Sequence, residues 1–157
     1  MRNLRRSALV AASPQRMFDL INDIERYPDF VPGCGGARVL ERTGALVRAE
    51  LTVGSGLMKT SFTTSNRLYP PHLIELQLES GPFRSLDGRW TLTPLAAGEV
   101  SGCRVELDLS FELQGGLAAL TLGPAMEKLA TSLVDAFVAR ARQLEALSVP
   151  AIRAAGC

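Results

Sequence analysis

EKLATSLVDAFVARARQL, residues 127–144, places an apolar side chain at every third or fourth position, with charged residues between them. This spacing is typical of a helix that buries one face and exposes the other. The apolar positions of this stripe, including two that precede the segment, are Leu122, Met126, Leu129, Leu133, Phe137, Ala141 and Leu144. We therefore expect a final helix of about 23 residues, near 35 Å long.

The chain before this helix has a different period. From Ala37 to Glu112, apolar and polar residues alternate in runs that are separated by glycine or proline. Strands with one apolar and one polar face form an antiparallel sheet that is covered on one side only. The predicted fold class is therefore α+β, with a curved antiparallel sheet of about six to seven strands around one long helix.

The first part of the chain predicts one strand and two short helices. Residues 4–10 lead directly into a helix start, so we expect them to form the first strand. Ser13-Pro14 is a typical helix start, with serine as the N-cap. A second helical turn follows and leads into YPDFVPGC, Tyr27–Cys34. Its two aromatic residues and two prolines predict a stiff apolar elbow.

Composition limits the kind of protein this is. The chain has 157 residues and a net charge of +1, so its overall charge does not favour nucleic acid or an anionic membrane. We expect one domain over residues 1–147 and a disordered tail over 148–157. Cys34, Cys103 and Cys157 are widely spaced, and His72 is the only histidine. We therefore expect no metal, no cofactor and no disulfide framework, as is typical of the cytoplasm.

No catalytic constellation is evident. A nucleophile activated by histidine would need His72, which lies in a predicted turn after two prolines. The acidic residues fall mostly on polar faces of strands and helix. We therefore expect a binding protein and not an enzyme.

Two polar residues stand out on an apolar face. If the register holds, Thr64 and Asn66 point inward beside Phe62, where each polar group needs a partner. That partner is a ligand carbonyl, a water or a neighbouring strand; with the register shifted by one, both residues would point outward. Trp90 and Phe83 are either plain core or a wall for a flat ring.

Several segments resemble the coenzyme-Q-binding START-like proteins, a family within the polyketide cyclase/START superfamily. They are ASPQRMFDLINDIERYPDFVPGC (residues 12–34), KTSFTTSNRL (59–68), GPFRSLDGRWTLTPL (81–95) and EKLATSLVDAFVARA (127–141). The resemblance covers about residues 3 to 145 and includes all the predicted elements. One departure is Gly33, where the family commonly has a tryptophan.

The resemblance implies a helix-grip fold with a hydrophobic tunnel that binds a prenylated quinone and supports respiratory electron transport. It places the elbow at the lip of the tunnel, and Gly33 there implies a wider or more mobile lip. The expected ligand-binding residues are Tyr27, Phe30, Pro32, Phe62, Asn66, Leu78, Phe83, Trp90, Phe111, Met126, Leu129, Leu133 and Phe137.

Two alternatives stay open. The same family includes a bacterial ribosome-association toxin, which implies binding of the large ribosomal subunit. Arg2, Arg5 and Arg6 with Arg140 and Arg142 would then supply a basic patch. The superfamily also includes polyketide cyclases and aromatases. Expected partners are thus an isoprenoid quinone or other lipid, or the large ribosomal subunit; the lipid role includes transient contact with the surface of the inner membrane.

Overall fold

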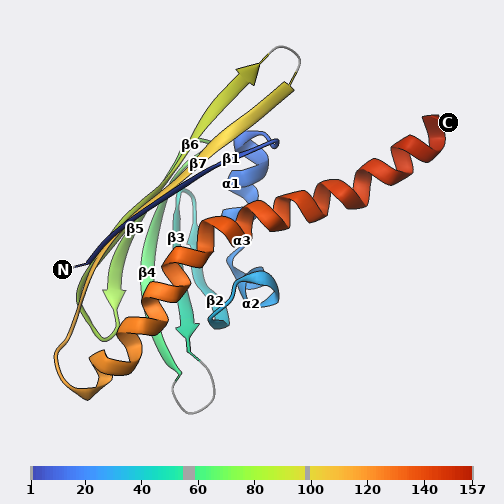
Figure 1. The fold of residues 1–157 in the computed structure, drawn as a ribbon. Coiled ribbons are helices and arrows are strands. Elements are labelled where there is room, and N and C mark those ends of the chain that lie inside the picture. Colours follow the sequence, from blue (N-terminus) through green and yellow to red (C-terminus); the bar gives the residue numbers. More distant parts are fainter. Residues whose placement is uncertain (1, 55–58, 98–99, 157) are drawn as a thin grey trace.

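The computed structural model describes residues 2–54, 59–97 and 100–156. Seven strands form one antiparallel sheet in the order β1-β7-β6-β5-β4-β3-β2, and a long helix crosses one face of it (Figure 1). The elements are β1 (Arg2–Val10), α1 (Pro14–Asn22), η1 (Ile24–Arg26), α2 (Tyr27–Phe30), β2 (Cys34–Thr43), β3 (Leu46–Val53), β4 (Thr60–Tyr69), β5 (Leu73–Ser80), β6 (Phe83–Ala97), β7 (Val100–Leu113) and α3 (Leu117–Gly156). The predicted fold class and element order are confirmed.

The short helices form where the sequence favours them. Ser13 caps α1, because its Oγ accepts a hydrogen bond from the backbone N–H of Arg16 at 3.1 Å. Pro28 lies in the first turn of α2, where its missing N–H costs nothing. The elbow is therefore partly helical, and it turns into β2 at Gly33, whose φ is +87°.

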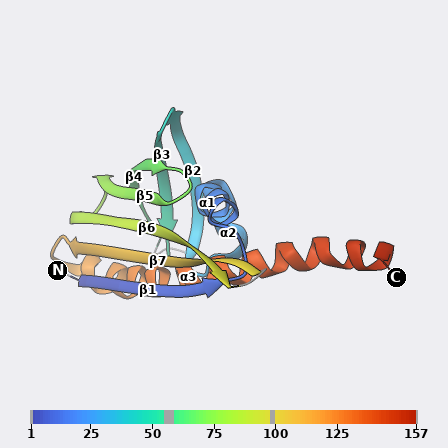
Figure 2. The same ribbon diagram turned by 90° about the horizontal axis from the view of Figure 1, so that it is seen from above.

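The sheet is strongly curved, as the view from above shows (Figure 2). Register shifts interrupt three pairs of strands: β2 with β3, β4 with β5, and β6 with β7. Such bulges bend a strand and increase its twist. They let the sheet wrap one helix, and the core fills the space between its inner face and α3.

Ion pairs join the first strand to the last helix. Arg6 Nη2 lies 3.2 Å from Asp135 Oδ2, and Arg2 pairs with Glu127. Four residues of strand span about 13 Å, and eight residues of helix span about 12 Å, so the two pairs match in spacing. The pairs fix the direction of β1 along α3.

Helix α3 is longer than predicted. It is continuous through Pro124 and extends to Gly156, whereas we expected about 23 residues and disorder over residues 148–157. Both views show it projecting beyond the sheet (Figures 1 and 2). Four of the residues after Leu144 are alanines (146, 151, 154 and 155), which favour helix although the segment has no clear apolar stripe. The domain boundary at residue 147 stays a prediction, and Cys157 lies outside the described residues.

Candidate functional site

A small cavity lies between α3 and the inner face of the sheet. Its volume is about 60 Å³, which is room for about two water molecules. Pockets for drug-sized ligands measure about 300–1,000 Å³. The lining is mostly apolar, and its polar members are Tyr27, Thr64 and Asn66. In this conformation the cavity does not admit a quinone ring.

The polar pair on β4 points inward, so the register predicted from the sequence is confirmed. Thr64 and Asn66 are both buried. Thr64 Oγ1 donates a hydrogen bond to Asn66 Oδ1 at 2.8 Å. The carbonyl oxygen of Asn66 thus has a partner on its own strand, and the Asn66 amide nitrogen still carries two N–H donors.

Aromatic rings close the cavity beside the elbow. The ring of Phe137 on α3 lies 5.1 Å from that of Tyr27, 5.3 Å from that of Phe30 and 5.3 Å from that of Trp90, edge to face in each case. Edge-to-face pairs at such distances add to the gain from burial. The elbow is therefore packed against α3, and it does not form the open lip that we expected.

Tyr27 anchors this arrangement. Its hydroxyl donates a hydrogen bond to the backbone carbonyl of Ile21 in α1. Burial raises the pKa of Tyr27 far above its ordinary value, with smaller contributions from Cys34 and Asp23. Tyr27 is thus a neutral donor, and it links the elbow to the end of α1.

The structure brings seven of the thirteen expected ligand-binding residues to the cavity. They are Tyr27, Phe62, Asn66, Trp90, Met126, Leu129 and Leu133. Phe83 and Phe111 lie in the core instead, where Phe83 packs 5.3 Å from the ring of Phe62. Leu78 is partly buried against the core. Their role in ligand binding stays a prediction.

Phe30 and Pro32 face a different space. They line a surface groove of about 350 Å³ between the elbow and α3. The guanidinium carbon of Arg140 lies 5.5 Å from the centre of the Phe30 ring. Within the elbow, Tyr27 thus lines the internal cavity, whereas Phe30 lines the surface groove.

Sequence reasoning missed several cavity residues because they look like ordinary core. They are Ile24, Ala49, Leu51, Leu76, Leu86, Leu109 and Ala130. Ala49, Leu51 and Leu76 fall on apolar faces of the predicted strands, so the period-two pattern was the available signal. The identity of these side chains does not show which part of the core contains a cavity.

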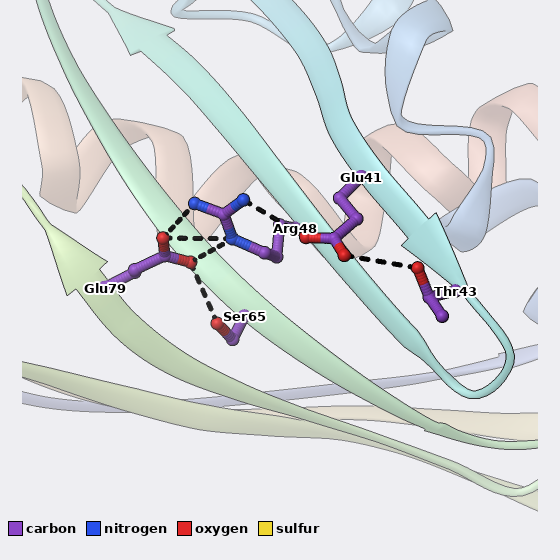
Figure 3. Close-up of polar contacts among 5 residues, drawn as sticks. All are labelled: Glu41, Thr43, Arg48, Ser65 and Glu79. Carbon is purple, nitrogen blue, oxygen red and sulfur yellow. Dashed lines mark hydrogen bonds and ion pairs between the residues drawn. The ribbon is translucent and has the colours of Figure 1, made fainter.

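An ion-pair network on the outer face of the sheet was also missed (Figure 3). Arg48 Nε lies 2.8 Å from Glu79 Oε2, and Arg48 Nη1 lies 3.2 Å from Glu41 Oε2. Ser65 and Thr43 donate to the two carboxylates. The hydrogen bonds from Arg48 lower the pKa of Glu79. Because these groups come from β2 to β5 and satisfy one another, the network ties four strands together.

The three N-terminal arginines of the expected basic patch are each paired with a carboxylate. Arg2 and Arg6 pair with acidic residues of α3, and Arg5 Nε lies 2.6 Å from Asp108 Oδ1 on β7. Arg5 also points to the opposite face of the sheet from Arg2 and Arg6, because side chains alternate along a strand. Carboxylates therefore offset the charges of these three arginines, which the sequence suggested for contact with RNA.

Other site chemistry is limited in the described part of the chain. Cys34 and Cys103 are buried free thiols, and burial raises the pKa of each. Among the described residues, no group of His, Cys, Asp and Glu is arranged to hold a metal. None of the described helices is long and apolar enough to cross a membrane.

Comparison with known proteins places the chain in a family. The model of the family "polyketide cyclase / dehydrase and lipid transport" matches residues 10–138. The chain belongs to this family. An aromatase/cyclase from a Streptomyces species shares the fold with a TM-score of 0.71 at 20% identity, covering 90% of this chain and 94% of that one. Such low identity shows a shared fold only.

Several relatives within the polyketide cyclase/dehydrase and lipid transport family carry one name. Proteins named "ribosome association toxin RatA" are 46% identical in Pseudomonas aeruginosa and 38% identical in Escherichia coli. The alignments cover 90% of this chain and 96% of the first relative, and 92% of this chain and 89% of the second. A mitochondrial coenzyme Q-binding protein homolog from Xenopus laevis is more distant, 25% identical over 88% of this chain and 57% of its own length.

Proposed function

We propose that this protein binds the large ribosomal subunit and opposes the joining of the subunits. The observation that carries the proposal is the near-complete alignment with ribosome association toxins, at 46% identity over 96% of one relative. The small internal cavity supports the same function. A cavity of about 60 Å³ is too small for a large ligand, so we expect a partner to bind the outer surface instead. A cytoplasmic location follows from this role.

The proposal is tested by sedimentation with purified ribosomal subunits. We expect the protein to travel with large subunits in a sucrose gradient and to lower the fraction of joined ribosomes when both subunits are present. Small subunits alone are the matched control and should carry none of it. Absence from the large-subunit fraction would overturn the proposal.

A second candidate is binding of a prenylated quinone, supported by the polar pair in the apolar cavity and by the distant coenzyme Q-binding relative. The amide N–H groups of Asn66 would donate to a quinone carbonyl, and each buried methylene would add about 0.8 kcal/mol. The cavity would have to expand several-fold, so this candidate has the weaker support.

The quinone candidate has its own test. The protein is incubated with a short-tailed ubiquinone and passed through a desalting column, and the retained quinone is extracted and measured. Near-stoichiometric retention that falls with Asn66→Leu is expected if the cavity opens. No retention by the wild-type protein would exclude it.

A cyclase or aromatase role has less support. The polar residues at the cavity, Tyr27, Thr64 and Asn66, do not include a carboxylate or a histidine. A general acid–base pair needs two groups that exchange protons near neutral pH. We therefore favour binding over catalysis.

A further inference from the structure

The outer face of the sheet is hollowed into a groove, on the side away from α3. Its volume is about 770 Å³, which is within the range of about 300–1,000 Å³ that ligand pockets span. Its wall consists largely of polar side chains that β1 and β4 to β7 direct outward. This is a far larger concave surface than the internal cavity.

A row of alternating charges crosses this groove from strand to strand. In register, Arg5 lies opposite Asp108, Asp108 opposite Arg89, Arg89 opposite Glu75, and Glu75 opposite Arg67. All five side chains line the groove. We call them the charge row. Its signs run plus, minus, plus, minus, plus.

Part of the charge row is available to a partner. Arg5 is held by Asp108 at 2.6 Å. Within the described residues, Arg67, Glu75 and Arg89 form no ion pair, although each lies across from an opposite charge. Asp87 also lines the groove, so its three arginines are matched by three carboxylates. A surface of this kind has no net charge but a strong alternating field.

The alternation indicates the class of partner. Binding of RNA relies on an excess of cations that displace counterions from phosphates, and this groove has no excess. A protein segment with both signs of charge fits better. Side chains three or four residues apart on a helix are about 5–6 Å apart, close to the spacing of about 4.8 Å between strands.

We infer that the charge row binds a segment of a ribosomal protein that carries acidic and basic side chains in alternation, and that ribosomal RNA is not its contact. The inference rests on the proposed function. It names the surface that makes the contact and the chemistry of the contact.

The experiment neutralises one charge of each sign at the row. Arg89→Gln and Glu75→Gln are compared with wild-type protein for binding to large subunits, measured by sedimentation across a range of subunit concentrations. A contact with both signs of charge predicts that each change weakens binding, by about three- to tenfold. The matched controls are Arg38→Gln and Glu50→Gln, an ion pair at 3.5 Å on β2 and β3 that does not line the groove. Neither control should change binding.

The outcomes separate the two proposals. If Glu75→Gln tightens binding while Arg89→Gln weakens it, the contact is RNA and the inference is wrong. If wild-type protein binds and both groove variants bind equally well, the groove is not the contact, while the proposed function stands. If wild-type protein does not bind, both fail. Equal thermal unfolding midpoints for the four variants show that they are folded.

Discussion

The ring of Phe137 meets the ring of Trp90 edge to face, with 5.3 Å between their centres. This contact joins the middle of α3 to β6. Tyr27 and Phe30 pack on the same ring of Phe137 from the elbow. One side chain thus connects the long helix, the sheet and the elbow, and it is fully buried.

Phe137→Ala should lower the free energy of unfolding by about 3–5 kcal/mol, because it removes a buried ring and leaves a cavity among three others. Denaturant unfolding followed by circular dichroism measures the change. Leu120→Ala on the same helix is the control, since Leu120 is 72% exposed and should change stability by less than about 0.5 kcal/mol. Equal effects of the two changes would contradict the central role of Phe137.

Thr64→Val should destabilise the protein by about 1–3 kcal/mol, because the buried carbonyl oxygen of Asn66 loses its donor. Combining it with Asn66→Leu should cost less than the sum of the two single changes, with a coupling of about 0.5–3 kcal/mol. Unfolding curves of the two single variants and the double variant give the coupling. Strict additivity would mean that the hydrogen bond at 2.8 Å contributes nothing.

The network around Arg48 predicts a pH dependence. The pKa of Glu79 is lowered from an ordinary 4.5, chiefly by hydrogen bonds from Arg48. The ionised carboxylate is favoured in the folded state, so its contribution to stability is complete above pH 4.5. The contribution is lost as the pH falls from 4.5 through the lowered pKa.

Glu79→Gln should therefore flatten the fall in stability below pH 4.5, in melting curves recorded from neutral to acid pH. The comparison variant is Asp29→Asn, which removes an exposed carboxylate 3.8 Å from Arg26 near the elbow. It should leave the slope as it is in the wild-type protein. The same slope in wild-type protein and Glu79→Gln would show that Arg48 does not hold this carboxylate.

Gly33 and Gly115 provide a test of backbone strain without steric clash. A Cβ at either position would meet no atom within 4 Å. Gly33 has a φ of +87°, which disfavours any side chain, whereas no positive φ is recorded for Gly115. Gly33→Ala should therefore destabilise the protein by about 1–2 kcal/mol, and Gly115→Ala should have little effect. Thermal melts measure both effects. Equal shifts of the unfolding midpoint in the two variants would contradict this prediction.

The fold was predictable because each element has a strong local signal. The stripe along residues 127–144 indicated the covering helix, and the alternation in β4 placed Thr64 and Asn66 inward correctly. Ser13 gave the start of α1. These signals come from the order of residues along the chain, so they can be read from a single sequence.

The site was less predictable because its features depend on packing between distant elements. Nothing in the order of residues shows that the rings of Tyr27, Phe30 and Phe137 meet and close the elbow. The charge row could not be seen either, because Arg5, Arg67 and Arg89 become neighbours of acidic residues only through strand register. The end of α3 was misjudged because helix propensity continues after the apolar stripe fades.

The order of the strands in the sheet affects how this chain folds during its synthesis. β1 lies at one edge of the sheet and pairs only with β7, and Arg2 pairs with Glu127, 125 residues later. During synthesis, the first strand therefore waits without a partner until β7 has left the ribosome. A ribosome that stalls midway would hold a nascent chain with an exposed strand edge, a form prone to aggregation. Closure of the fold therefore depends on β7 and on the part of α3 that carries Glu127 and Asp135, which are made long after β1.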